Sequence, residues 1–374
     1  MRKIVIYHPF LSIVGGAELV IRSLAEYLSA NNLVHVISHD EYRLDIPNVT
    51  YTNIKIPHKK FNLINNTMIS REIKKVLGKS FYDILITSNA PPVIDYLISE
   101  KRQANTQHFC WRHDLRRVGN VIGKSKEGMK TRIRNEIYKK LDVLAYRNHY
   151  DKIIVYSEFM RNMLREKLQV SSNKIIKIPW GINTKSINQK PLTESKKVLY
   201  VGRIDESKNV YRLMEAMKIV RQKDKDSKLI IVGPVGEVER KRFFNMLKKT
   251  EDAVEYFGVI TFDKREELQK LYEESQVVAY PTIDEPWGLV PLEAMANARP
   301  VIVGTGGSRE SVENGVTGFY VNPFDVKDIA EKISNLLTSF DLCKTMGING
   351  RKKVEREFDI SKTYSAIDKL IEQS

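Results

Sequence analysis

The chain has 374 residues and a mass of 43.2 kDa, which is too long for one compact core and indicates about two domains. A hydrophobic fraction of 42% and a mean hydropathy of -0.35 argue against a disordered or membrane-spanning protein. Two cysteines far apart in the sequence, Cys110 and Cys343, argue against a disulfide framework or a thiolate metal site. Strand-like residues begin at Ile4, so we expect no signal peptide and predict a cytoplasmic protein.

Basic residues outnumber acidic ones, with 61 Lys and Arg against 46 Asp and Glu and a formal net charge of +15. Such a surplus attracts polyanions, which include nucleic acid, an anionic membrane face and phosphorylated substrates. The surplus is uneven, because residues 112–147 hold eleven basic side chains and four acidic ones. A solvated helix face would explain this stretch as well as a binding surface would.

Short β-branched runs alternate with amphipathic segments through the first half of the chain. Strands are predicted at 3–7, 33–38, 83–87, 106–110, 152–156 and 174–178, and helices at 17–28, 93–99 and 157–168. The apolar runs are continuous rather than alternating, which is typical of parallel strands that helices cover on both faces. The pattern therefore predicts an α/β domain with a parallel sheet.

A second series of the same kind follows a polar stretch at 183–197. Its strands are predicted at 198–202, 228–233, 254–258, 277–280, 300–303 and 318–321. We therefore predict two doubly wound, Rossmann-like domains, 1–184 and 185–360, and a last helix at 361–373 that could pack on either domain. Open parallel sheets bind ligands at the carboxyl ends of their strands, so functional residues should follow strands, and facing domains would share a cleft.

Two glutamates follow the strand predicted at 277–280. Glu285 would lie in the loop, and Glu293 would lie inside a helix that starts near Gly288. The first backbone N–H groups of a helix are unpaired and cradle phosphate well, whereas the flanking carboxylates would grip hydroxyl groups. The amides in question belong to Gly288, Leu289 and Val290. Acidic residues favoured by the helix dipole are the simpler explanation of an isolated pair.

Two cations follow the strand predicted at 198–202. Arg203 offers a planar fork of donors and Lys208 a point charge, a combination suited to a diphosphate. A helix capped by Ser207, with both cations solvated, explains the spacing equally well. Gly15 and Gly16 follow the first strand, where glycine lets backbone amides approach a ligand, although a plain turn would look the same.

These motifs together resemble the retaining GT-B glycosyltransferases of family four, the glycosyl transferases group one. The resemblance rests on the segments 202–208 and 231–233, on Glu285 and Glu293 with Gly-Leu-Val between them, and on 306–310 with 314–318. Further matches lie at 15–18, 156–159 and 179–183. They occur in the family's order and span most of the chain. The resemblance also implies that the last helix, at 361–373, packs back on the first domain.

The resemblance implies roles for individual residues. Arg203 and Lys208 would bind the donor's diphosphate and stabilise the leaving group, and Glu285 would hold the donor sugar. Glu293 would hold the ribose hydroxyls. The donor-binding set would also include the amides of Gly288, Leu289 and Val290, the glycines Gly15 and Gly16, and a base pocket lined by Gly233, Pro234, Gly258 and Val259.

The sequence departs from the family after the strand at 106–110. Many relatives carry a histidine near the acceptor where this chain has Trp111. His113, two residues later, would take its place as a catalytic residue, or the role is absent. Trp111 and Arg112 could contact a sugar or phosphate of the acceptor.

The predicted function is transfer of a hexose from a UDP- or GDP-linked sugar to an acceptor hydroxyl with retention, in glycan or glycoconjugate synthesis. The nucleotide sugar would be a co-substrate, and no cofactor or metal is expected. Asp224 and Asp226 match an Asp-x-Asp metal pattern, but they lie in a lysine-rich loop that disfavours a divalent cation.

An amphipathic basic segment at 57–79 adds to the charge of 112–147. Segments of this kind lie on anionic membranes. We therefore expect a peripheral enzyme at the inner face of the membrane, acting on a saccharide or a lipid-linked acceptor.

Three alternatives remain open at this stage. One is a sugar-nucleotide epimerase or a phosphorylase on the same scaffold, and another is a donor-binding protein without turnover. The third, from a different class, is a basic nucleic-acid-binding protein, although no motif or aromatic platform for nucleic acid is visible and none is expected as a partner.

Overall fold

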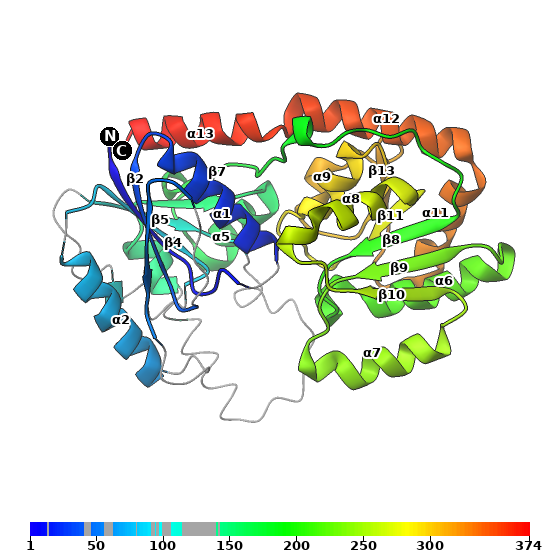
Figure 1. Ribbon diagram of the computed structural model, residues 1–374, viewed down its shortest axis with the longest axis horizontal. Coiled ribbons are helices and arrows are strands. Elements are labelled where there is room, and N and C mark those ends of the chain that lie inside the picture. The colour runs from blue at the N-terminus through cyan, green and yellow to red at the C-terminus, as the bar shows by residue number, and fades with distance from the viewer. Residues whose placement is uncertain are drawn as a thin grey trace. The chain divides into compact units, whose positions relative to one another are not determined.

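We describe the protein from a computed structural model, which defines residues 1–12, 15–40, 46–55, 63–79, 81–90, 94, 97–98, 106–113, 140 and 143–374. Contacts between residues divide the chain into two compact units (Figure 1). The first unit holds Met1–Ile178 and Lys369–Ser374, and the second holds Pro179–Asp368. Each unit is described by itself.

The first unit is built on a seven-stranded parallel sheet. Its strands are β1 (Lys3–Tyr7), β2 (Leu33–Ser38), β3 (Val49–Asn53), β4 (Ile84–Ser88), β5 (Gln107–Trp111), β6 (Lys152–Val155) and β7 (Ile175–Lys177). Its described helices include α1 (Gly16–Ser29), α2 (Leu63–Leu77) and α5 (Glu158–Leu168). The spatial order is β3-β2-β1-β4-β5-β6-β7, so the order reverses between β1 and β4.

The second unit repeats the arrangement with a six-stranded parallel sheet, ordered β10-β9-β8-β11-β12-β13. Its strands are β8 (Lys197–Val201), β9 (Lys228–Val232), β10 (Val254–Gly258), β11 (Val277–Tyr280), β12 (Val301–Val303) and β13 (Gly318–Tyr320). Its helices are α6 (Val210–Lys223), α7 (Glu237–Lys249), α8 (Arg265–Glu274), α9 (Leu289–Ala296), α10 (Ser308–Ser311), α11 (Val326–Thr338) and α12 (Phe340–Glu357). The order reverses between β8 and β11.

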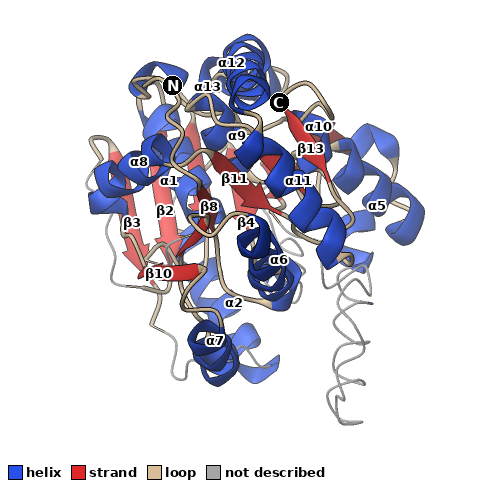
Figure 2. Cartoon of the chain, turned by 90° about the vertical axis from the view of Figure 1, so that its right-hand side faces the viewer, coloured by secondary structure: helices blue, strands red, loops and turns tan. Residues whose placement is uncertain are grey.

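Helices pack on this second sheet because its strands are apolar on both faces. Every residue of β11 and β12 is buried. Helix α6 packs against α11, and these two helices lie together in Figure 2. Their buried side chains join those of β8 and β9 in one hydrophobic core. Continuous apolar strands are thus explained by cover on both sides.

The predicted fold class is confirmed: the chain folds as two Rossmann-like α/β domains. The predicted strands are present, with ends shifted by one or two residues in several cases. Strand β3 was not predicted. Its sequence, Val-Thr-Tyr-Thr-Asn, is mostly polar because it lies at the edge of the sheet, where the apolar signal is weak. The predicted helix at 93–99 falls largely outside the described residues.

The last helix, α13 (Ile360–Glu372), begins in the second unit, and its final residues group with the first. The Arg2 side chain donates to the backbone carbonyl of Ser374 at 3.1 Å, so the two chain ends lie side by side (Figure 1). The contact-defined boundary at 178/179 lies six residues before the predicted one at 184. Among the described residues, no helix is both long and apolar enough to cross a bilayer.

One buried cation fastens the polar stretch after the first unit to the second sheet. The Arg299 side chain is fully buried, and burial lowers its pKa below the usual value of an arginine. Its guanidinium donates to five backbone carbonyls, those of Tyr272, Glu273, Asn297, Lys190 and Pro191. The stretch around Lys190 therefore has a defined place although it contains no helix or strand.

Replacing this cation should be costly. We expect Arg299→Met to lower the free energy of unfolding by about 3 kcal/mol or more, because several buried carbonyls lose their donor at about 1–3 kcal/mol each. Urea unfolding would measure the change. Arg356→Met is the matched control, since the Arg356 side chain is 69% exposed and pairs only with its neighbour Glu357 among the described contacts. Equal effects of the two substitutions would contradict the assigned role.

Candidate active site

Glycines stand at the carboxyl ends of three neighbouring strands in the second unit. Gly202 follows β8, Gly233 follows β9 and Gly258 ends β10. Gly233 has a φ of +141°, and a Cβ atom there would lie 2.0 Å from the Gly202 carbonyl oxygen. No other residue fits this approach. Because these strand ends carry no side chain, a ligand can come close to their backbone.

A charged cluster lies where the strand order of this sheet reverses. The Lys208 ammonium donates to Glu285 Oε2 at 2.5 Å and to the Tyr280 hydroxyl at 2.9 Å. Tyr280 also donates to Glu285 Oε2 at 3.1 Å. The Lys208 and Glu285 side chains are only 14% and 11% exposed, so this ion pair is largely shielded from water. The structure thus brings two of the predicted residues together, from segments 77 residues apart.

Arg203 lies at the end of β8 with its side chain 48% exposed. Its guanidinium lies 3.3 Å from Asp205 Oδ2. Burial would raise the pKa of Asp205, but a hydrogen bond from Ser207 and the charge of Arg203 lower it below the usual value of 3.8. Asp205 also accepts from the Lys208 backbone amide and so caps the turn Glu206–Lys208. The alternative in which Ser207 caps the next helix is wrong, because Asp205 caps this turn and Asn209 precedes α6.

Helix α9 starts directly behind this cluster. Gly288 precedes it with a φ of +84°, which turns the chain into the helix. Leu289 and Val290 occupy the first positions, and Pro291 stands third, where its missing N–H costs nothing. The first turn thus presents backbone amides that have no acceptor within their own helix. The predicted helix start is confirmed to within one residue.

Glu293 is held from two sides. Tyr272 of α8 donates to Glu293 Oε2 at 2.8 Å, and Arg265 donates to Oε1 at 2.9 Å. Tyr272 is buried, and both burial and the Glu293 charge raise its pKa well above the usual value of 10.0. The Arg265 side chain is 46% exposed. One oxygen therefore has a fixed partner and the other a displaceable one.

The predicted base pocket follows β9 and β10. Pro234 accepts from the Ile204 amide at 3.0 Å, and Gly233 accepts from the Tyr256 hydroxyl at 2.9 Å. A Cβ atom on Gly258 would meet nothing within 4 Å, and Val259 is 47% exposed. These residues form an open surface beside the bare strand ends.

Trp287 fastens the loop that carries Glu285. Its indole N–H donates to the Trp180 carbonyl at 2.8 Å, and its ring packs edge-on against Phe358 at a centroid distance of 5.5 Å. Trp287 and Trp180 are almost fully buried. The loop is therefore anchored to the segments near the two ends of the second unit, where the chain enters it and leaves it.

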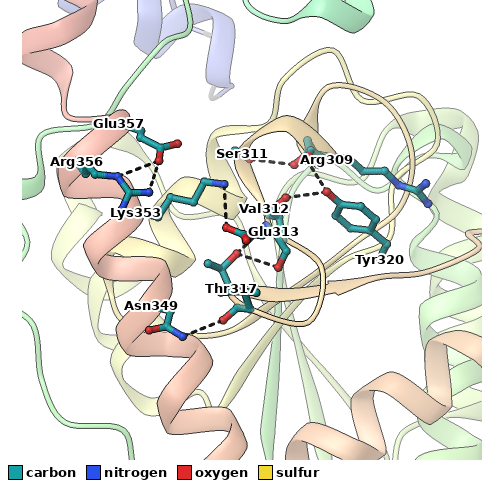
Figure 3. A network of polar contacts seen from close by, with 12 residues as sticks. Arg309, Ser311, Val312, Glu313, Thr317, Tyr320, Asn349, Lys353, Arg356 and Glu357 are labelled. Carbon is teal, nitrogen blue, oxygen red and sulfur yellow. Dashed lines mark hydrogen bonds and ion pairs between the residues drawn. The ribbon is translucent and has the colours of Figure 1, made fainter.

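The segment that follows β12 is also fixed by polar contacts. Figure 3 shows the Tyr320 hydroxyl donating to the carbonyls of Arg309 and Val312, at 2.7 and 2.8 Å. Lys353 of α12 reaches Glu313 at 3.8 Å, and the Glu313 amide donates to Thr317. The backbone amide of Gly307 in turn donates to the Glu285 carbonyl at 2.6 Å. This segment, which resembles the family's, thus supports the charged cluster.

In the first unit the three residues predicted near the acceptor have different settings. Trp111 and Arg112 are buried, and the Arg112 guanidinium lies 5.4 Å from the Tyr146 ring centroid. Their burial argues against the predicted contact with an acceptor. His113 is half-buried and makes hydrogen bonds from both ring nitrogens, to Ser88 and Tyr156. Burial, with the charges of His8 and Arg112, lowers its pKa well below 6.5.

Gly15 and Gly16 stand where α1 begins. Gly15 is its N-cap in extended conformation, and Gly16 is its first residue. The carboxylate of Glu18, in the same first turn, lies against Gly15, because a Cβ atom there would be 2.4 Å from Glu18 Oε2. Glycine at position 15 thus makes room for a carboxylate of the protein itself, which the doublet alone did not predict.

Several expectations fall wholly or partly outside the described residues. Most of the basic stretch 112–147 and the start of the segment 57–79 lie there. Within the described ranges, no group of three or more His, Cys, Asp or Glu side chains could hold a metal. Asp224 caps α6 and lies 3.6 Å from Lys196, as a surface residue would.

Sequence reasoning missed Tyr280, Tyr272 and Arg265, which hold the two glutamates. Tyr280 ends a predicted strand, so its position at the ligand edge could have pointed to it. Tyr272 and Arg265 lie on α8, and nothing in their spacing signals a contact with Glu293. Only the packing of α8 beside α9 brings them together.

Two family models match the chain. "Glycosyl transferases group 1" matches residues 183–353, and "Glycosyltransferase Family 4" matches residues 14–186. The chain belongs to the family 4 glycosyltransferases of the GT-B fold. The predicted family membership is thereby confirmed.

Relatives of this glycosyltransferase include bacterial and archaeal proteins. It is 30% identical over 206 residues to the capsular polysaccharide biosynthesis glycosyltransferase CapM of Staphylococcus aureus, a match that covers 55% of this chain and 51% of CapM. It is 26% identical over 372 residues to an uncharacterized glycosyltransferase of Methanocaldococcus jannaschii, covering 98% and 96% of the two chains.

Solved structures share its fold across the whole chain. Sucrose-phosphate synthase from Thermosynechococcus elongatus superposes with a TM-score of 0.84 at 23% identity and covers 100% of this chain and 99% of its own. Anabaena HepE, in complex with UDP and glucose, has a TM-score of 0.80 at 16% identity, with 100% of both chains covered. At these identities the likeness concerns the fold alone.

The close approach at Gly233 gives a test within this glycosyltransferase. We expect Gly233→Ala to lower the free energy of unfolding by about 3 kcal/mol or more, because it combines a positive φ with a clash against backbone. Gly236→Ala is the control, since a Cβ atom there meets nothing within 4 Å and its φ is -64°. Its cost should stay below about 1 kcal/mol. Thermal unfolding would measure the stability of both variants. Equal unfolding midpoints would contradict the role assigned to the close approach at Gly233.

Proposed function

We propose that this glycosyltransferase moves a hexose from a nucleoside diphosphate sugar to an acceptor hydroxyl, with retention at the anomeric carbon. The observation that carries the proposal is the shielded contact of Lys208 with Glu285 and Tyr280, next to the first turn of α9. The site combines a cation, a carboxylate and helix-start amides where the strand order reverses. A sugar diphosphate suits it, because the carboxylate can accept from the sugar hydroxyls while the cation and the amides can donate to the phosphates.

The chemistry would be electrostatic. Breaking the bond between the sugar and the phosphate develops negative charge on the diphosphate. Lys208, the exposed guanidinium of Arg203 and the amides at the start of α9 are positioned to stabilise that charge, and such fixed groups contribute several kcal/mol in a shielded site. Among the described residues, the Arg203 guanidinium has one ion pair, a surface contact with Asp205, so it can turn to the phosphate at little cost.

Glu285 would bind sugar hydroxyls while Lys208 neutralises it. A carboxylate beside a phosphate is repelled unless a cation lies between them, and Lys208 lies in contact with Glu285. Glu293 would accept the ribose hydroxyls through Oε1, with Arg265 giving way and Tyr272 keeping Oε2 in place. Both glutamates thus keep one fixed neighbour on ligand binding.

The comparisons support the class of donor and of acceptor. HepE was crystallised with UDP and glucose, and CapM is named for capsular polysaccharide biosynthesis. We therefore propose a UDP-linked hexose as the first donor to test, with a GDP-linked one as the alternative. A saccharide or lipid-linked acceptor is proposed, at an anionic membrane surface that the net charge of +15 would favour.

Arg203→Ala tests the leaving-group role. We expect kcat/KM to fall about 100-fold or more, since a donor to the developing charge is lost, while stability changes little because the side chain is exposed. Arg240→Ala, which removes an exposed guanidinium from α7, should keep the activity of the unsubstituted enzyme. The assay would use UDP- and GDP-hexoses with saccharide and polyprenyl phosphate acceptors, and NMR would report the anomeric configuration. Unchanged turnover in Arg203→Ala, or an inverted product, would refute the mechanism.

The two partners of Glu293 should act oppositely on nucleotide binding. Tyr272→Phe removes the fixed donor and should weaken UDP binding about tenfold, through loss of one hydrogen bond to a charged group. Arg265→Ala releases Oε1 and should leave the affinity for UDP unchanged or slightly higher. Isothermal titration calorimetry with UDP and GDP would measure both effects. If Arg265→Ala weakens binding more than Tyr272→Phe does, Glu293 is not the ribose acceptor.

A further inference from the structure

Five polar side chains form a continuous chain across the carboxyl edge of the first sheet. The Tyr156 hydroxyl lies 2.5 Å from His113 Nδ1, and His113 Nε2 lies 2.8 Å from Ser88 Oγ. Ser88 Oγ lies 2.8 Å from His8 Nδ1, and His8 Nε2 lies 3.5 Å from Glu18 Oε1. The five residues come from the ends of β6, β5, β4 and β1 and from the first turn of α1. This row of five side chains therefore bridges the point where the strand order reverses.

The carboxylate at one end gives these hydrogen bonds a direction. A carboxylate only accepts, so the His8 nitrogen that faces Glu18 must carry a proton, since a lone pair there would face an anion. In the neutral form of His8, Nδ1 is then unprotonated and accepts from Ser88. Ser88 has a single proton, so its oxygen must accept from His113 Nε2–H. His113 Nδ1 is left to accept from the Tyr156 hydroxyl.

Burial keeps this chain from passing a proton along. Shifting every proton by one bond would protonate Glu18 and leave Tyr156 as a phenolate. Burial raises the pKa of Tyr156 well above 10.0, and the Glu18 charge raises it further, so the phenolate is disfavoured. The chain is therefore a device that orients its members, and both nitrogens of His113 are used within it.

We propose that Glu18 fixes His113 as the neutral tautomer protonated at Nε2, acting through His8 and Ser88, and that His113 is a positioning residue rather than a catalytic base. The reaction it serves is the proposed glycosyl transfer, on which this inference rests. Its role is to hold the carboxyl ends of four strands in fixed positions through one connected set of hydrogen bonds. This reassigns the catalytic role that the resemblance gave to His113.

The titratable groups around His113 come from several elements. His8 faces it from the end of β1, with ring centroids 6.3 Å apart, and Arg112 precedes it in the loop after β5. Tyr156 faces it from the end of β6, and the Glu18 carboxylate lies beyond His8. Burial is the main cause that lowers the pKa of His113 well below 6.5, and the charge of Arg112 lowers it further. Because the unfolded chain binds this proton more readily, stability should fall as the pH drops below about 6.5.

The test reads the tautomer directly. The whole chain would be labelled with 15N in its histidines, and long-range 1H–15N spectra at pH 7.5 would separate protonated from unprotonated ring nitrogens. A His113→Gln variant identifies the His113 signals. We expect one set for His113, protonated at Nε2 and unprotonated at Nδ1. Signals of the other tautomer, or of the imidazolium, in the unsubstituted protein would overturn the proposal whatever the variants do.

Glu18→Gln removes the direction while keeping the shape, because an amide donates as well as accepts. We expect a second His113 signal set, protonated at Nδ1, and a fall in kcat of about tenfold with little change in the donor KM. Glu26→Gln is the matched control, since Glu26 is an exposed residue of the same helix. It should match the unsubstituted protein. Unchanged His113 signals in Glu18→Gln would reject the role of Glu18.

The pH profile of kcat separates positioning from base catalysis. His113→Gln should lower kcat at every pH and leave the shape of the profile unchanged, whereas removal of a general base would abolish its acidic limb. The spectra need no substrate. If His113 shows the expected tautomer but the protein transfers no sugar, the proposed function alone is rejected. If the protein transfers sugar normally but His113 shows the other tautomer, this inference alone is rejected.

Discussion

Both units depend on one geometric constraint, the reversal of strand order in a parallel sheet. In the first sheet the strands run outward from β1 and β4, and in the second from β8 and β11. The connections of such neighbours leave in opposite directions, so the sheet edge between them stays open at the carboxyl ends. His8 and Ser88 meet at one reversal, and Lys208 and Glu285 at the other. The topology of the backbone thus brings these distant segments together, whatever side chains they carry.

The second reversal carries charge because its carboxylate and its cation are shielded together. A buried glutamate alone would lose its hydration and become neutral, and a buried lysine would do the same. In the structure Lys208 and Glu285 contact each other and the Tyr280 hydroxyl next to a helix start. A ligand that brings an anion and hydroxyl groups finds a partner for each. The anchoring of Trp287 keeps this loop in place without using any of its ligand-facing atoms.

The sequence predicted what depends on local pattern. Continuous apolar runs predicted the two parallel sheets, because both faces are covered, and the same rule missed β3, whose edge position removes that requirement. The spacing of Glu285 and Glu293 predicted a loop followed by a helix start. Their partners Tyr280, Tyr272 and Arg265 could not be predicted, since the pairings with α8 depend on how that helix packs. The resemblance similarly gave His113 a role without showing that both of its nitrogens are used.

The two reversals differ in a way that suits different tasks. Near β8 and β11 the groups are charged. Arg203 and Arg265 form their ion pairs at the surface, where a pair is weak enough to exchange partners when a ligand binds. At β1 and β4 the groups are histidine rings and hydroxyls that each contact the next, with the Glu18 carboxylate at one end of the row. A neutral, saturated network holds geometry and offers no charge to a ligand. Under the proposed function, the donor chemistry is therefore assigned to the second unit, and the proposed contribution of the first is the fixed position of its strand ends.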